Sequence, residues 1–87
     1  MSLFADGGAM KTDEELVLET ILAETGQLAA SDTTMDALGM QSLDFLELML
    51  RIEDVTGVRI PAAKVQTIER VADIYAALEA ERAAVSS

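Results

Sequence analysis

The chain has 87 residues, 51% of them hydrophobic, which is enough for one small domain with a buried core. Sixteen acidic residues against six basic ones give a net charge of −10, which disfavours binding to nucleic acid and to anionic membranes. The absence of cysteine excludes disulfides and thiolate metal sites and fits a reducing, cytoplasmic compartment, and no apolar run approaches the roughly 18 residues of a membrane span.

The first predicted elements are a tail and a helix. Residues 1–10 contain two adjacent glycines and show no periodicity, so we predict a flexible N-terminal tail. Helical periodicity follows: Thr12 or Asp13 can cap a helix that has acidic residues in its first turn and ends at Gly26. The apolar spacing predicts that its core face comprises Val17, Leu18, Ile21 and Leu22.

Residues 27–41 form a long connection that is rich in Ser, Thr, Asp and Gly. A loop of this length in a small domain needs apolar anchors of its own, a function, or both. The predicted anchors recur along the loop and are Leu28, Met35, Leu38 and Met40.

The second half of the chain predicts three more helices. A helix over residues 42–56 ends at Gly57, residues 62–66 can form one short turn after Pro61, and a last helix starts near residues 67–69. The predicted core residues of this last helix are Val71, Ile74, Tyr75 and Leu78. The expected fold is all-α: a small four-helix bundle, three main helices plus one short helix, with a long loop between helices one and two. The domain is expected over residues 11–83, followed by a C-terminal tail at 84–87.

The segment 42–56 carries two apolar stripes when it is placed on a helical wheel. The first is an ordinary core face made of Phe45, Leu48, Met49, Ile52 and Val55. The second consists of Leu43, Leu46 and Leu50, and is bordered by Ser42, Glu47, Glu53 and Asp54. An apolar centre with a charged rim is typical of a surface that binds partner proteins. The alternative is that Leu43 or Leu46 packs beneath the 27–41 loop.

Ser42 stands at the start of this helix, where a serine commonly serves as an N-cap. The capping box would be incomplete, because Phe45 occupies the position that Glu or Gln takes in that motif. A nucleophilic serine needs a base, and the chain has no histidine, while Lys64 lies across a turn. The acidic residues follow neither zinc-site nor calcium-loop spacing. We therefore predict no catalytic residue and no metal site.

The stretch DALGMQSLDFLELMLRIEDVTGVRIP (36–61) resembles the signature of acyl carrier proteins, and TIERVADI (67–74) is similar to the start of that family's last helix. The resemblance covers essentially residues 12–80, including the long first loop and the short third helix. It implies a carrier protein rather than an enzyme. Ser42 would bear a covalent 4′-phosphopantetheine arm derived from coenzyme A, which carries acyl intermediates as thioesters in fatty-acid, polyketide or specialised lipid biosynthesis.

The resemblance also implies partners and their contacts. Docking would use Leu43, Glu47, Leu50, Glu53 and Asp54. The expected partners of the monomeric protein are a phosphopantetheinyl transferase and acyl-loading and acyl-processing enzymes with basic docking patches. Core residues that could part to shelter an acyl chain are Leu48, Ile52 and Ile60.

The chain departs from the family pattern at two positions before the serine, and a basic residue also lies on the helix that follows. Gln41 stands where the family usually has Asp, Ala37 occupies a site that is often acidic, and Arg51 would interrupt the acidic face. These departures favour a specialised carrier that serves a dedicated pathway. Two alternatives remain open: an aminoacyl or peptidyl carrier, whose loop usually reads Gly-Gly-His-Ser, and an acidic helical adaptor in which Ser42 is only an N-cap.

Overall fold

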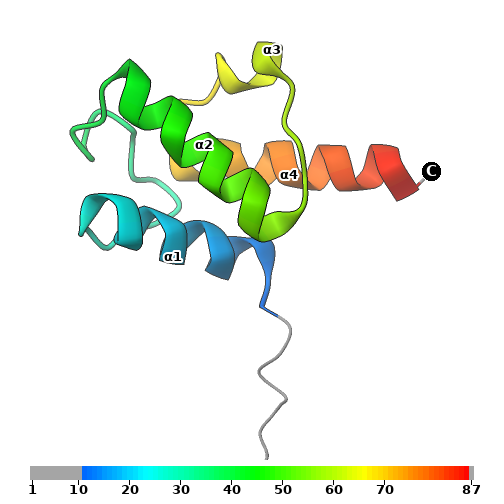
Figure 1. The fold of residues 1–87 in the computed structure, drawn as a ribbon, viewed down its shortest axis with the longest axis horizontal. Coiled ribbons are helices and arrows are strands. Elements are labelled where there is room, and N and C mark those ends of the chain that lie inside the picture. The colour runs from blue at the N-terminus through cyan, green and yellow to red at the C-terminus, as the bar shows by residue number, and fades with distance from the viewer. Residues whose placement is uncertain (1–10, 87) are drawn as a thin grey trace, which may run out of the picture.

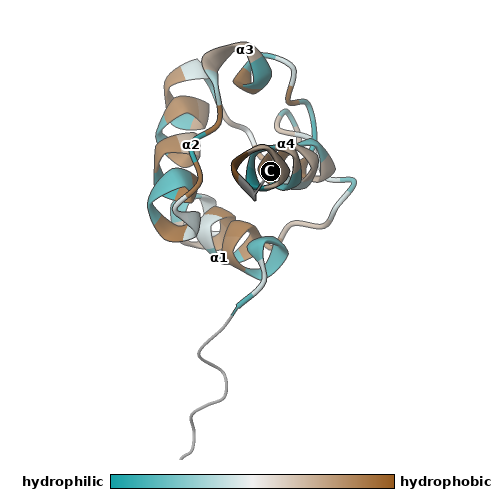
Figure 2. Ribbon diagram, turned by 90° about the vertical axis from the view of Figure 1, so that its right-hand side faces the viewer, coloured by the Kyte–Doolittle hydropathy of each residue, from teal (hydrophilic) through white to brown (hydrophobic). Residues whose placement is uncertain are grey.

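A computed structural model describes residues 11–86, which form four helices (Figure 1). These are α1 (Asp13–Thr25), α2 (Ser42–Thr56), α3 (Ala62–Val65) and α4 (Val71–Ser86). Seen along α4, the other three helices are arranged around it, with the short α3 on the opposite side from α1 (Figure 2). The predicted all-α bundle with one short helix and a long first loop is confirmed. None of the helices in this part of the chain is long and apolar enough to cross a membrane.

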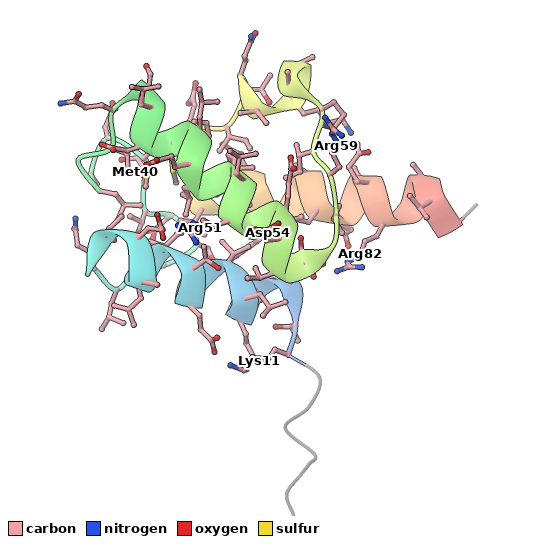
Figure 3. All side chains as sticks on the ribbon, viewed as in Figure 1. Lys11, Met40, Arg51, Asp54, Arg59 and Arg82 are labelled. Atoms are coloured by element: carbon pink, nitrogen blue, oxygen red, sulfur yellow. The ribbon has the colours of Figure 1, made fainter. Side chains whose placement is uncertain are left out.

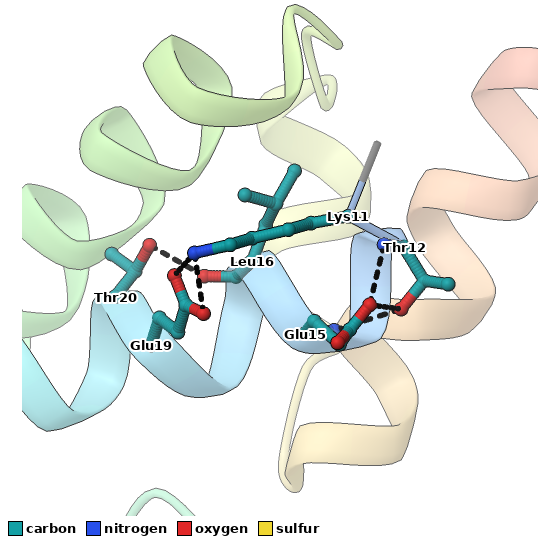
Figure 4. A network of polar contacts seen from close by, with 6 residues as sticks. All are labelled: Lys11, Thr12, Glu15, Leu16, Glu19 and Thr20. Carbon is teal, nitrogen blue, oxygen red and sulfur yellow. Dashed lines mark hydrogen bonds and ion pairs between the residues drawn. The ribbon is translucent and has the colours of Figure 1, made fainter. Parts of the chain in front are cut away.

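The start of α1 is fixed by a capping box (Figure 4). The Glu15 N–H donates to Thr12 Oγ1 at 3.1 Å, and the Glu15 carboxylate accepts from the Thr12 N–H at 2.9 Å. The hydrogen bonds that the Thr12 N–H and, secondarily, the Thr12 hydroxyl donate to the carboxylate hold the pKa of Glu15 below its ordinary value. At the other end, Gly26 adopts φ 74°, a left-handed conformation that glycine reaches without strain. Both predicted ends of the helix are therefore confirmed, with Thr12 as the cap.

The core is one cluster of buried apolar side chains from all parts of the described chain. Its members are Val17, Ile21, Met35, Leu38, Leu48, Met49, Ile52, Val58, Ile60, Ile68, Val71, Ile74, Ala77 and Leu78.

Most of the predicted core residues belong to this cluster or pack against it, but three predictions were wrong. Leu22 and Val55 are 42% and 47% exposed, because each lies at the edge of its helix's buried sector. Leu28 is 87% exposed, and the smaller Ala29 contacts the core in its place. Leu46 is half-exposed and Leu43 is more exposed still, so the alternative that either packs beneath the long loop does not hold.

The long loop is tied to the start of α4, which explains why α4 begins later than predicted. Glu69 and Arg70 donate their N–H groups to Asp73 Oδ2 at 2.9 and 3.1 Å and are not helical. The next two N–H groups, of Val71 and Ala72, donate to loop carbonyls at 2.9 and 2.8 Å. The loop thus satisfies donors that a helix N-terminus leaves unpaired.

At its other end α4 continues to Ser86, so residues 84–86 are helical rather than a tail. The predicted tail at 1–10 lies outside the described residues.

The Arg82 guanidinium joins three helices at one end of the bundle (Figure 3). Its Nε and Nη2 donate to the Asp13 carboxylate at 2.6 and 2.7 Å, and Nη2 also donates to the Thr56 carbonyl at 3.0 Å. The hydrogen bond from Arg82 lowers the pKa of Asp13. This side chain therefore ties α4 to the beginning of α1 and to the end of α2.

Replacing Arg82 with glutamine is expected to lower the melting temperature near neutral pH, because all three hydrogen bonds are lost. A carboxyl group whose pKa is lowered by folding stabilises the folded state above its unfolded pKa, and this contribution disappears as the pH falls through its folded pKa. The difference in melting temperature between wild type and Arg82→Gln should therefore narrow as the pH falls below the ordinary pKa of an aspartate, about 4, and the part due to the bond to the Thr56 carbonyl should remain. The control is Arg70→Gln, which removes the same charge without breaking an ion pair among the described residues. Equal losses in both variants would show that only net charge matters.

Candidate functional site

Ser42 is the first residue of α2 and not its N-cap, which corrects the expectation that it caps the helix. The N-cap is Gln41, whose backbone is extended and whose carbonyl accepts the first helical hydrogen bond, from the Phe45 N–H at 2.9 Å. The Gln41 N–H donates to the Asp44 carboxylate at 3.4 Å. Sequence reasoning missed this arrangement because it took Ser42, rather than the preceding Gln41, as the N-cap. Asp44 is the acidic residue three positions after the true N-cap.

The Ser42 side chain is exposed, and its hydroxyl makes no hydrogen bond with any residue that the structure describes. The N–H groups of Ser42 and Leu43 lie in the first turn of α2, where no helical carbonyl can accept from them. Free N–H groups and the helix dipole favour a negatively charged group at this position. A phosphodiester on Ser42 Oγ therefore fits the residues present.

One face of α2 is exposed and apolar along its centre. Leu43, Leu46 and Leu50 are 76%, 50% and 62% exposed, although leucine is among the residues most often buried. The spacing of three and four residues places them on one side of the helix. The face continues from Ser42 toward the end of α2, and we call it the exposed α2 face: Leu43, Leu46, Glu47, Leu50, Glu53 and Asp54.

The acidic rim of the exposed α2 face is also as predicted. Glu47 and Asp54 are exposed, and Glu53 is half-buried. Asp54 lies on the side of α2 that faces the viewer in Figure 3. Arg51, expected to interrupt this acidic face, instead reaches toward α1, where its Nε lies 3.7 Å from the Glu24 carboxylate. The rim is therefore more uniformly acidic than the sequence indicated.

A groove of about 560 Å³ runs between α2 and the segment that leads into α3. Leu46, Leu50 and Glu53 line one side, and Arg59 and Val65 lie on the other. Beneath the bundle surface, Leu48, Ile52 and Ile60 are buried, as expected of residues that form the core. Sequence reasoning missed the groove, because nothing in the spacing of residues 57–66 shows how the short α3 folds back over α2.

The carboxylates leave a large net repulsion, because the described residues form only four ion pairs. At physiological ionic strength, dissolved salt largely screens the repulsion between exposed charges that lie more than ~8–10 Å apart. We therefore expect the melting temperature to rise with sodium chloride. It should rise further with magnesium chloride at equal ionic strength, by loose binding to neighbouring carboxylates such as Glu53 and Asp54. No group of three metal-ligating side chains occurs in residues 11–86, so this binding should be weak. A flat or falling melting temperature would show that the ion pairs outweigh the repulsion.

Comparison with known proteins assigns the chain to a family. Its sequence matches the family described as "Phosphopantetheine attachment site" over residues 15–78. It is 30% identical over 70 residues to an acyl carrier protein of Zymomonas mobilis, a match that covers 80% of this chain and 90% of that protein. The chain belongs to the acyl carrier protein family. A second acyl carrier protein, from Saccharopolyspora erythraea, is 36% identical over 62 residues, which are 66% of this chain and 65% of that protein.

Membership of the acyl carrier protein family confirms the main functional expectations. The chain is a cofactor-bearing carrier rather than an enzyme, and its cofactor is covalent 4′-phosphopantetheine. The comparisons do not support the aminoacyl-carrier or adaptor alternative better than the acyl carrier assignment. The matched range includes Ser42 and the whole exposed α2 face.

Proposed function

We propose that Ser42 is the residue that bears the phosphopantetheine arm, and that the exposed α2 face docks the enzymes that load and unload it. The observation that carries the proposal is the free, exposed hydroxyl at the N-terminus of a helix whose adjoining face is apolar and acid-rimmed. The setting is fatty-acid, polyketide or specialised lipid biosynthesis. The arm supplies a thiol that holds acyl groups as thioesters.

The chemistry at Ser42 requires little from this chain. A transferase removes the hydroxyl proton, the bond from Ser42 Oγ to phosphorus forms, the diphosphate bond of coenzyme A breaks, and adenosine 3′,5′-bisphosphate leaves. The base belongs to the transferase, which accounts for the absence of histidine in the chain. The N-terminus of α2 then stabilises the phosphodiester charge. The carboxylates of Asp44 and Glu47, on the first two turns of α2, partly oppose this effect.

Docking follows from charge and from exposed apolar area. A partner with a basic patch is drawn to the acidic rim, which speeds association, and the leucines supply the apolar contact that slows dissociation. This arrangement suits a phosphopantetheinyl transferase and acyl-processing enzymes that must bind in turn and release. We further propose that the protein acts as a monomer, so that its single exposed α2 face remains available to each of them.

The carrier function is tested by loading with an acyl group. Incubation with octanoyl coenzyme A and a promiscuous phosphopantetheinyl transferase should raise the intact mass by one octanoyl-phosphopantetheinyl group. Hydroxylamine should then remove the octanoyl group and leave the arm, because a thioester reacts while the phosphodiester does not. A mass gain that resists hydroxylamine, or no gain with several transferases, would contradict the proposal.

A further inference from the structure

The groove between α2 and α3 contains a cation without a partner. The chain has sixteen acidic and six basic residues, so carboxylates are abundant. Four of the six basic side chains pair with a carboxylate within 4 Å among the described residues, but Arg59 does not. Glu53 lines the same groove as Arg59 and still forms no ion pair with it. The guanidinium is therefore available to a ligand.

The groove starts one helical turn beyond Ser42, which does not line it, and includes Arg59. Leu46 lies one turn after Ser42 on the same side of α2, and the apolar lining continues through Leu50 to Glu53. Arg59 lies in the connection between α2 and α3, at the opposite end of α2 from Met40 (Figure 3). From Leu46 to Glu53 the helix rises about 10 Å. The groove is thus lined mostly by apolar side chains, with Glu53 and Arg59 at the end away from Ser42.

An acyl group tethered to Ser42 through the phosphopantetheine arm has a higher local concentration at this groove than any free ligand. Tethering replaces a bimolecular encounter with an effective concentration in the millimolar range, so even a weak groove is occupied by cargo. Burial of an alkyl chain against Leu46, Leu50 and Val65 is favourable in proportion to the apolar area removed from water. An alkyl chain offers no hydrogen-bond acceptor to the Arg59 guanidinium. The planar guanidinium can donate two parallel hydrogen bonds to a carboxylate.

We propose that Arg59 makes this carrier selective for acyl groups with a carboxylate at their far end. The proposal rests on the proposed attachment at Ser42. In the loaded protein, the methylene chain packs between α2 and α3, and the Arg59 guanidinium donates hydrogen bonds to the terminal carboxylate. Glu53, on the same groove, disfavours a carboxylate that does not reach Arg59, so the selectivity depends on length.

The test compares two cargoes of equal length on the intact protein. Wild type, Arg59→Gln and Arg70→Gln are loaded from octanoyl coenzyme A or from its analogue with a terminal carboxyl group, and intact mass confirms each loading. The measured quantity is the melting temperature of the carboxyl-terminated form minus that of the octanoyl form, at low ionic strength and neutral pH. Arg70 is the matched control, because it has the same charge, forms no ion pair with another described residue and does not line the groove.

The expected result is that Arg59→Gln lowers this difference by a few degrees, whereas Arg70→Gln leaves it at the wild-type value. Equal differences in wild type and Arg59→Gln would overturn the proposal, as would an equal decrease in both variants. Absence of any loading in the mass spectrum would instead contradict the attachment at Ser42, so the two failures are distinguishable. Both variants change exposed side chains, and the melting curves of the unloaded proteins report any loss of folding.

Discussion

Substitution of Ser42 by alanine should abolish the addition of phosphopantetheine and leave the fold intact. The substitution removes the hydroxyl that we propose to react, and the described residues make no hydrogen bond with it. Because Gln41 rather than Ser42 is the N-cap, the free energy of unfolding should change by less than about 0.5 kcal/mol instead of the ~1 kcal/mol expected for a lost cap. Intact mass after incubation with coenzyme A and a transferase measures the first effect, and thermal melting measures the second.

The matched control for this prediction is Ser31→Ala, which removes another serine hydroxyl that is exposed and lies in the long loop. That variant should gain one phosphopantetheinyl group as wild type does. If Ser42→Ala still gained the group, another hydroxyl would be the attachment site. If it failed to fold, the loss of modification would have no bearing on the role of the hydroxyl, and Ser42→Cys, which keeps the size of the side chain, would replace it in the same assay.

Two changes on the exposed α2 face should slow modification without unfolding the protein. Leu43→Ala removes apolar contact area from a side chain that is 76% exposed, and should reduce the efficiency of modification about tenfold if Leu43 is a docking hot spot. Glu47→Lys reverses a rim charge and should slow association by roughly tenfold at low salt, with a weaker dependence on ionic strength. The measurement is the initial rate of phosphopantetheine transfer as a function of transferase and salt concentration.

Matched controls exist elsewhere on the surface for both changes. Leu28 is 87% exposed in the long loop, and Glu79 is an exposed acid on α4. The Leu28→Ala and Glu79→Lys variants should be modified by the transferase at nearly the wild-type rate, because they keep the exposed α2 face unchanged. Rates that fell equally in test and control variants would show that hydrophobicity and net charge act over the whole surface. A large loss of helicity in Leu43→Ala would show that this leucine supports the fold.

Much of the fold was predictable because local chemistry determines it. The Thr12 cap, the stops at Gly26 and Gly57 and the two stripes of α2 follow from capping, backbone freedom and helical period. The start of α4 was not predictable in this way. Glu69 and Arg70 are held out of the helix by Asp73, while the loop carbonyls take the next donors, and these contacts depend on how the loop lies across the bundle.

The candidate site, too, was predictable only where local sequence patterns determine it. The exposure of Leu43 and Leu50 followed from a helix with more apolar positions than one core needs. The side of α2 on which Arg51 lies, and the position of Arg59 at the end of a groove, depend on neighbouring helices that the local pattern does not place. The N-cap at Gln41 was missed by one residue, since several polar residues near a helix start can serve as caps and only the backbone distinguishes them.

The most direct measurement is a fragmentation mass spectrum of the full-length protein after reaction with coenzyme A and a phosphopantetheinyl transferase. Attachment at the start of α2 predicts a single phosphopantetheinyl group, carried by every fragment that contains Ser42 and by none that lacks it. A group located on another serine or threonine, or several groups spread over the chain, would contradict the assignment of Ser42 as the attachment site.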